Sequence, residues 1–89
     1  PSHGHLYNDL AVYLFELERY DEALDSLLKS IDEGVYNPER FRAYYNLGKV
    51  FLKQNYMIDA QKAFSKSLAL NPTFQPAQIA LDSLDSILL

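Results

Sequence analysis

Residues 41–74 read FRAYYNLGKVFLKQNYMIDAQKAFSKSLALNPTF, and this segment determines how the chain folds. Its apolar residues recur every three or four positions in two blocks, and no part of it alternates with the two-residue period of a strand. The blocks meet near Asn55, a residue type that tolerates a left-handed turn, and the second block ends at Asn71-Pro72. The segment therefore predicts two helices joined by a tight turn.

The same pattern of residue types occurs earlier in the chain, at a shift of 37 residues. Small, large and aromatic residues align in both copies: Tyr7 with Tyr44, Leu10 with Leu47, Ala11 with Gly48, Leu14 with Phe51, Ala23 with Ala60, Leu27 with Phe64 and Ser30 with Ser67. In this spacing the chain resembles the tetratricopeptide repeat, whose period is about 34 residues. Small residues at the aligned positions predict that the paired helices approach each other closely.

The resemblance implies an all-α fold, an α-solenoid of antiparallel helix pairs with about two and a half repeats and five helices. We expect the first repeat at 4–37, the second at 41–74, and a capping or partial third repeat at 75–89. Asn37-Pro38 predicts the start of the third helix. In the last segment polar residues stand where full repeats are apolar, as in a capping helix, while its apolar tail predicts self-association through this helix.

Composition excludes several classes of function. The 89 residues contain no Cys, so disulfides and thiolate zinc sites are absent, and the three glycines are isolated and form no phosphate-binding loop. No Ser lies at a recognisable motif spacing from a His. His3, His5 and Asp9 resemble a metal cluster only at the chain terminus, where a solvated end is expected. We therefore expect no enzyme activity, no cofactor, no metal and no membrane insertion by this segment.

Charge is distributed unevenly along the sequence. Residues 1–37 carry eight acidic and two basic side chains, residues 38–75 carry six basic and two acidic ones, and residues 76–89 add two acids. The net charge of −4 argues against a nucleic-acid partner. The distribution indicates either two differently solvated faces or ends that complement neighbours in an assembly.

In this repeat the first helices of the pairs look onto a concave groove that binds peptides. The resemblance places ten groove residues here: His5, Asn8, Val12, Phe15, Arg42, Tyr45, Asn46, Lys49, Leu52 and Lys53. The same groove-facing repeat positions also include Asp9 and Glu16 in the first repeat and Ile79, Ala80 and Ser83 in the last segment. Apolar, amide and cationic side chains together suit a peptide with apolar residues and some negative charge. The alternative is that about half of this set packs between neighbouring helices, as inter-helix packing generally requires.

The best-known groove of this superfamily is the clamp with which co-chaperones hold acidic chaperone tails. At its five positions the chain has Asn8, Val12, Asn46, Pro76 and Ala80, and only Asn46 matches. The chaperone-tail interpretation is therefore weak.

A closer resemblance rests on Tyr36, Pro38-Glu39-Arg40 and Asn46-Leu47-Gly48. These runs are similar to those of the bacterial type IV pilus pilotins, tetratricopeptide lipoproteins of the outer membrane. The resemblance implies a non-enzymatic role in secretin assembly, a secretin subunit as partner, and a location at the periplasmic face of that membrane. Two alternatives are a generic adaptor that binds a peptide of a cytosolic partner, with a cytoplasmic location, and a regulatory segment of a larger enzyme.

Overall fold

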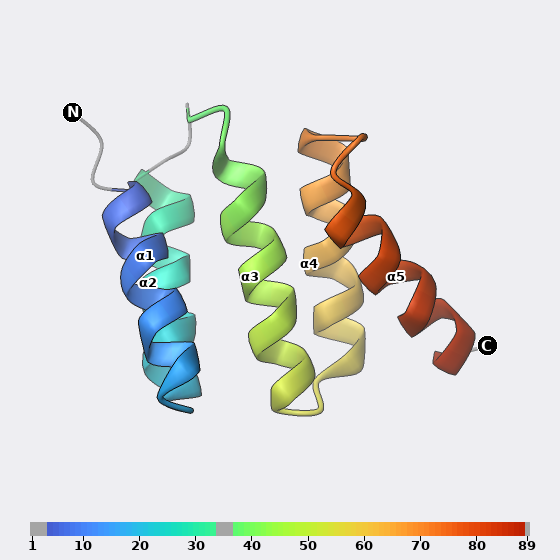
Figure 1. Ribbon diagram of the computed structural model, residues 1–89, viewed down its shortest axis with the longest axis horizontal. Helices are drawn as coiled ribbons and strands as arrows, with labels where there is room; N and C mark the ends of the chain where they lie inside the picture. Colours follow the sequence, from blue (N-terminus) through green and yellow to red (C-terminus); the bar gives the residue numbers. More distant parts are fainter. Residues whose placement is uncertain (1–3, 34–36, 89) are drawn as a thin grey trace.

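The computed structural model describes residues 4–33 and 37–88, and these residues form five α-helices and no strand (Figure 1). The helices are α1 (Gly4–Glu16), α2 (Tyr20–Glu33), α3 (Arg40–Lys53), α4 (Met57–Leu70) and α5 (Gln75–Leu88). Each helix packs on the next and runs in the opposite direction. The all-α fold and the expected helix pairs are thus confirmed.

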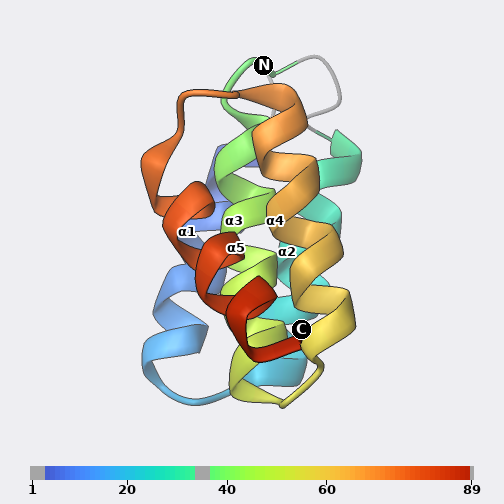
Figure 2. The same ribbon diagram turned by 90° about the vertical axis from the view of Figure 1, so that its right-hand side faces the viewer.

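The helices form two layers. Figure 2 shows α1, α3 and α5 on one side of the molecule and α2 and α4 on the other. The Cα atoms span 41 × 28 × 16 Å, so the molecule is elongated along the direction in which the helix pairs stack. This is the geometry of a short solenoid, in which each unit contacts only its neighbours.

Equivalent turns join the helices of both pairs. Asn55 adopts a left-handed conformation with φ 65°, as predicted, and Glu18, 37 residues earlier, does the same with φ 60°. The N–H groups of Tyr56 and Arg19 donate to the carbonyls of Phe51 and Leu14, at 2.8 and 2.9 Å. This six-to-one hydrogen bond is the Schellman motif that closes a helix. The repeat is therefore precise down to its turns.

The start of α3 differs from the prediction. The helix begins at Arg40 rather than at Asn37-Pro38, and no side chain caps it. The Asn37 side-chain oxygen instead accepts a hydrogen bond from the Glu39 N–H at 2.9 Å, which closes an Asx turn before the helix. Asn71 makes the same turn before α5, where its side-chain oxygen accepts from the Thr73 N–H at 3.3 Å. Asn-Pro thus marks a connecting turn in this chain.

Two hydrophobic clusters hold the solenoid together. The first joins α1, α2, α3 and α4 through buried residues such as Ala23, Leu27 and Leu47. The second joins α3 and α4 to α5 around Phe64 and Leu84. Ser67 lies fully buried between them, and its hydroxyl donates to the Phe41 carbonyl at 2.8 Å. The small residues of the repeat lie in these clusters, as their close approach requires.

The exposed surface of α5 is largely polar, with Ile79, Ile87 and Leu88 as its large exposed apolar residues. Gln78 donates to Asp82 at 2.8 Å on this surface, and Gln61 of α4 donates to Asp85 at the same distance. Such side chains suit a helix with water on one side. Among the described residues, no helix is both long and apolar enough to cross a bilayer.

Candidate functional site

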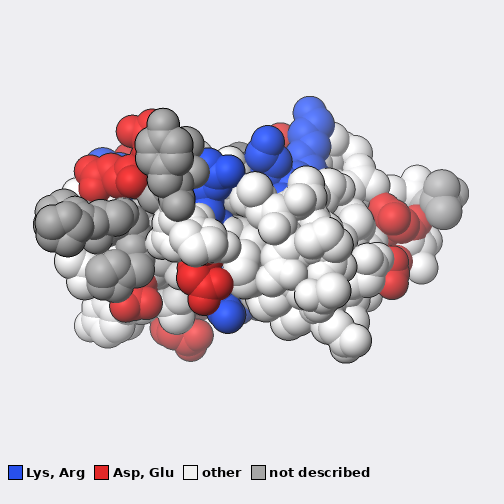
Figure 3. All heavy atoms as spheres, turned by 90° about the horizontal axis from the view of Figure 1, so that it is seen from above, with Lys and Arg blue, Asp and Glu red and all other residues white. Residues whose placement is uncertain are grey.

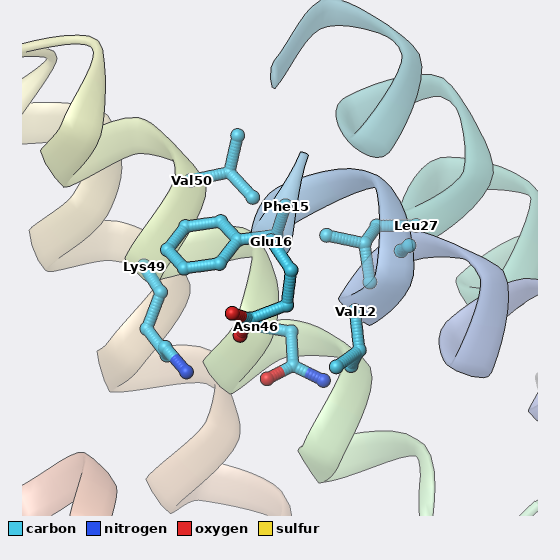
Figure 4. A pocket seen from close by; sticks show the side chains of 8 residues that line it. Val12, Phe15, Glu16, Leu27, Asn46, Lys49 and Val50 are labelled. Atoms are coloured by element: carbon cyan, nitrogen blue, oxygen red, sulfur yellow. The ribbon is translucent and has the colours of Figure 1, made fainter. Parts of the chain in front are cut away.

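Side chains from α1 and α3 converge on a small cavity between these helices (Figure 4). The cavity measures about 20 Å³, room for roughly one water molecule. Its lining is Ala11, Val12, Phe15, Glu16, Leu27, Asn46, Lys49 and Val50. We call the surface around this cavity the α1–α3 groove. Val12 is 43% exposed and offers an apolar contact at its mouth.

Two amide side chains link the helices beside the cavity. Asn46 of α3 donates through Nδ2 to Oδ1 of Asn8 on α1 at 2.9 Å, and both side chains are partly buried. This bond leaves each amide with further hydrogen-bonding capacity, since an amide has two donors and two lone pairs. The pair can therefore pin the two repeats together and still meet the backbone of a bound peptide.

Cations lie over aromatic rings along the groove. The ammonium of Lys49 is 5.1 Å from the ring centroid of Phe15 and 5.5 Å from that of Tyr45. In the part of the chain that the structure describes, Lys49 and Lys53 make no ion pair. The Arg42 guanidinium lies 5.0 Å from the Phe41 ring and holds Glu39 at 3.4 Å. Both lysines are thus available to a carboxylate of a partner.

Three of the apolar groove candidates pack against the protein itself. The Tyr45 ring contacts Phe64 and Phe74, with centroids 5.7 and 5.3 Å apart. Leu52 packs against the cluster around Phe64, and Phe15 makes an edge contact with Tyr20 at 5.6 Å. All three are half-buried. These three side chains form the half-buried base of the groove and are only partly accessible to a ligand.

The remaining candidates differ in their exposure, and Glu16 also lines the cavity. Asp9, Glu16, Lys53, Ile79 and Ser83 are exposed, and Ala80 is half-buried against the cluster around Phe64. His5 belongs to α1, but its side chain lies outside the described residues, as do His3 and the cluster suggested for them. No metal-binding group of three ligands occurs among the residues that the structure describes.

One supporting residue could not be named from the sequence. Phe74 packs edge-on against Phe41, at 4.8 Å, and against Tyr45, and it lies 5.7 Å from the Arg42 guanidinium. It fixes the orientation of the base of the groove from the connection between α4 and α5. The only sequence signal is an aromatic residue just after Asn71-Pro72-Thr73.

The charge asymmetry of the sequence is visible on the surface. Seen from above, acidic side chains gather at the end formed by α1 and α2, basic ones lie in the middle, and acids return toward α5 (Figure 3). The α1–α3 groove lies at the boundary, where acidic Asp9 and Glu16 on α1 face a basic α3. A bound peptide would therefore meet opposite charges on the two helices.

The tetratricopeptide repeat family matches residues 41–74 and, separately, residues 4–33. Together with the paired helices and the repeated turns, this match decides the classification. The chain belongs to the tetratricopeptide repeat family. Members of this family are generally non-catalytic modules for protein interaction.

Two known proteins are similar to this chain in sequence. It is 40% identical over 78 residues to the type IV pilus assembly protein PilF of Pseudomonas aeruginosa, covering 88% of this chain and 30% of PilF. It is 31% identical over 65 residues to the Protein STIP1 homolog of Dictyostelium discoideum, covering 68% of this chain and 12% of that protein. The chain thus spans less than a third of either relative.

Solved structures give the same result. The structure of Pseudomonas aeruginosa PilF superimposes with a TM-score of 0.86 and 33% identity, over 91% of this chain and 36% of that one. The first repeat domain of Spaghetti (RPAP3), bound to the HSP90 peptide SRMEEVD, matches with a TM-score of 0.51 at 20% identity, over 96% and 92% of the two chains. The second match supports the fold alone, whereas the first establishes homology to PilF.

Proposed function

We propose that the repeat protein acts in type IV pilus assembly as a pilotin does, by holding a segment of the pilus secretin in the α1–α3 groove. The observation that carries this proposal is the combination of 40% identity to PilF with a TM-score of 0.86. The aligned stretch is 78 residues long and covers 88% of this chain. The corresponding place of action is the periplasmic face of the outer membrane.

The chemistry of the groove supports a peptide ligand with apolar and acidic residues. The exposed Val12 offers an apolar contact, and the amides of Asn8 and Asn46 can bond a peptide backbone. Lys49 and Lys53 supply cations without an internal ion pair among the described residues. A carboxylate of the ligand would form charge-assisted hydrogen bonds with them.

A chaperone-tail ligand has less support. A tail such as the SRMEEVD peptide of the Spaghetti complex presents several carboxylates close together. Beyond Asn46, the clamp positions of this chain hold Asn8, Val12, Pro76 and Ala80, none of which carries a charge. An acidic tail would meet no cation at those positions, so the pilus partner is the better candidate.

Binding of the purified secretin tests the proposal. We expect the full chain to retain the secretin and Val12→Arg and Lys49→Glu each to weaken binding, because they block the apolar mouth and reverse the accessible cation. Lys62→Glu is the matched control, since Lys62 is an exposed lysine of α4 outside the groove. Unchanged binding by both groove variants would mean that the groove is misplaced. No binding by the unaltered chain would reject the secretin as partner.

A chimera tests the pilus role independently of the groove. The segment of Pseudomonas PilF that matches this chain can be replaced by the chain itself, and surface pili counted by electron microscopy. Retained piliation is expected. Loss of pili, with the chimera present at normal abundance, would contradict the assignment to pilus assembly.

A further inference from the structure

A second cavity lies between the first three helices, at the end of the molecule where α3 begins (Figure 1). It measures about 270 Å³ and shares no lining residue with the cavity of the α1–α3 groove. Most of its lining is polar or charged, whereas the cavity of the α1–α3 groove is mostly apolar. We call it the Arg40 pocket, and its charged and amide side chains are Asn8, Asp9, Asn37, Glu39, Arg40 and Arg42.

Arg40 is the cation of this pocket that lacks a partner. The side chain is half-buried, and its Nε atom is buried without a hydrogen-bond partner among the described residues. Arg40 also takes part in none of the ion pairs found there. Arg42 differs, because it holds Glu39 at 3.4 Å and lies 5.0 Å from the Phe41 ring. A buried donor without an acceptor costs free energy, so Arg40 favours an acceptor that enters the pocket.

The two carboxylates of the pocket do not supply that acceptor. Glu39 is the ion-pair partner of Arg42. Asp9, on the α1 side, is exposed and belongs to none of the ion pairs of the described residues. Water solvates an exposed carboxylate, whereas the Arg40 Nε is removed from water. The poorly solvated cation therefore decides the preference of the pocket, which is for an anion.

A pair of amides joins the Arg40 pocket to the α1–α3 groove. Asn8 lines the pocket, Asn46 lines the cavity of the groove, and a hydrogen bond of 2.9 Å connects the two side chains. The side-chain oxygens of Asn8 and Asn37 accept the bonds from Asn46 and from the Glu39 N–H. Their side-chain N–H groups can donate to an anion. A peptide in the groove therefore reaches the pocket by passing the amide pair.

We propose that the Arg40 pocket binds an acidic side chain of the peptide held in the α1–α3 groove. The inference rests on the proposed function in taking that peptide from the secretin. The Arg40 guanidinium presents paired donors to a carboxylate, and the amide groups of Asn8 and Asn37 lie in the same pocket. The site is distinct from the chaperone-tail clamp, because Asn8 alone of the clamp positions lines it.

The distance between two cations sets the spacing of acids in the ligand. Arg40 and Lys49 are nine positions apart on α3, which corresponds to about 13 Å along the helix. An extended peptide covers this distance in about four residues. A peptide that reaches both cations therefore carries two acidic residues about four positions apart.

Nuclear magnetic resonance of the arginine side chains tests the pocket without the secretin. The chain has three arginines, Arg19, Arg40 and Arg42, so the loss of one Nε–H signal in Arg40→Lys assigns that signal. The probe is the peptide acetyl-EAVAE-amide, whose glutamates have the required spacing, and the control is acetyl-QAVAQ-amide. We expect the glutamate peptide to shift the Arg40 signal more than the Arg19 signal and the glutamine peptide to shift neither.

Substitutions of arginine locate the binding, with affinity measured from the backbone amide shifts. Arg40→Gln is expected to weaken binding of the glutamate peptide by about tenfold, to the level of the glutamine peptide. Arg40→Lys keeps the charge but loses the planar paired donors, so an intermediate loss is expected. Arg19→Gln changes the net charge equally at an exposed residue outside both cavities and should leave binding unchanged. Circular dichroism confirms that each variant is folded.

The outcomes separate this inference from the proposed function. No binding of either peptide, equal affinity for both, or undiminished binding by Arg40→Gln would overturn the Arg40 pocket. Equal retention of the purified secretin by Arg40→Gln and by the unaltered chain would also overturn it, while the groove would remain the secretin site. Peptide binding at Arg40 by a chain that does not retain the secretin would support the pocket and reject the secretin as its source.

Discussion

Gly48→Ala tests whether the close approach of α3 and α4 is set by one missing methyl group. A Cβ built on Gly48 would lie 2.6 Å from Cε1, 2.7 Å from Cδ1 and 2.8 Å from Cζ of the Phe64 ring. Carbon atoms in ordinary contact are about 3.5–4.0 Å apart, so the ring would have to retreat by about 1 Å. Phe64 is fully buried and also contacts Tyr45, so it has little room to do so.

Two opposing effects decide the size of the change. Alanine is the better helix former and alone would stabilise α3 by about 1 kcal/mol. Overfilling a packed core costs about 1–3 kcal/mol, and a contact this short belongs at the upper end of that range. We therefore expect the free energy of unfolding to fall by about 1–2 kcal/mol, which lowers Tm by about 5–15 °C in a domain of this size.

The first repeat provides the matched control. Its equivalent pair is Ala11 and Leu27. Alanine is larger than the glycine of the second repeat, and leucine is smaller than its phenylalanine. Gly48→Ala with Phe64→Leu recreates that pair in the second repeat. Phe64→Leu alone should cost about 1–2 kcal/mol, and the double variant should be less destabilised than the sum of the singles by about 1 kcal/mol or more.

Urea denaturation followed by circular dichroism measures all four proteins. A Gly48→Ala variant that is more stable than the parent would mean that helix propensity dominates and that the ring yields easily. Additivity of the two substitutions within about 0.5 kcal/mol would show that Gly48 and Phe64 are not coupled, and the reasoning from their contact would be refuted.

Other substitutions probe the turn, the buried hydroxyl and the last helix. Glu18→Asn should raise stability by about 0.5–1 kcal/mol, because asparagine tolerates the left-handed turn at lower cost; an unchanged Tm would contradict this. Ser67→Ala should lower the free energy of unfolding by about 1 kcal/mol through loss of its bond to the Phe41 carbonyl, whereas Ser65→Ala, at an exposed position of the same helix, should not lower it in the same urea titration, because alanine is the better helix former. Leu84→Ala, at a position only 2% exposed, should cost about 3 kcal/mol and speed amide exchange in α5 more than in α1; uniform exchange would argue that α5 does not open separately.

Local features of the fold could be predicted from the sequence because short-range chemistry determines them. Apolar spacing gave the helices, and Asn55 gave the left-handed turn. The start of α3 could not be predicted, since Asn-Pro suits both a helix cap and an Asx turn, and the bond from the Glu39 N–H to Asn37 selects the turn. Glu18 was missed for the opposite reason, because its residue type disfavours the conformation that the repeat imposes.

The groove residues were only partly predictable. A position in the repeat indicates which face of the helix a side chain lies on, but not which other side chains it contacts. Tyr45 was expected among the groove residues, and its ring packs against Phe64 and Phe74. Phe74 lies in the connection after α4, and no residue near Tyr45 in the sequence predicts their contact. The accessible contacts are instead Val12 and the lysines, so they are the residues by which a ligand is best tested.

The first and last helices of the solenoid expose different kinds of side chain. The outward side of α5 presents Gln78 and Asp82, hydrogen-bonded to each other, as suits a surface in contact with water. On α1, apolar Leu6, Leu10 and Tyr13 are exposed together with acidic Asp9 and Glu16. Self-association through α5 remains a prediction. It is consistent with the exposed apolar side chain of Ile87. Because α1 carries only acidic charges and α3 only basic ones, a ligand in the α1–α3 groove would meet negative charge on one helix and positive charge on the other.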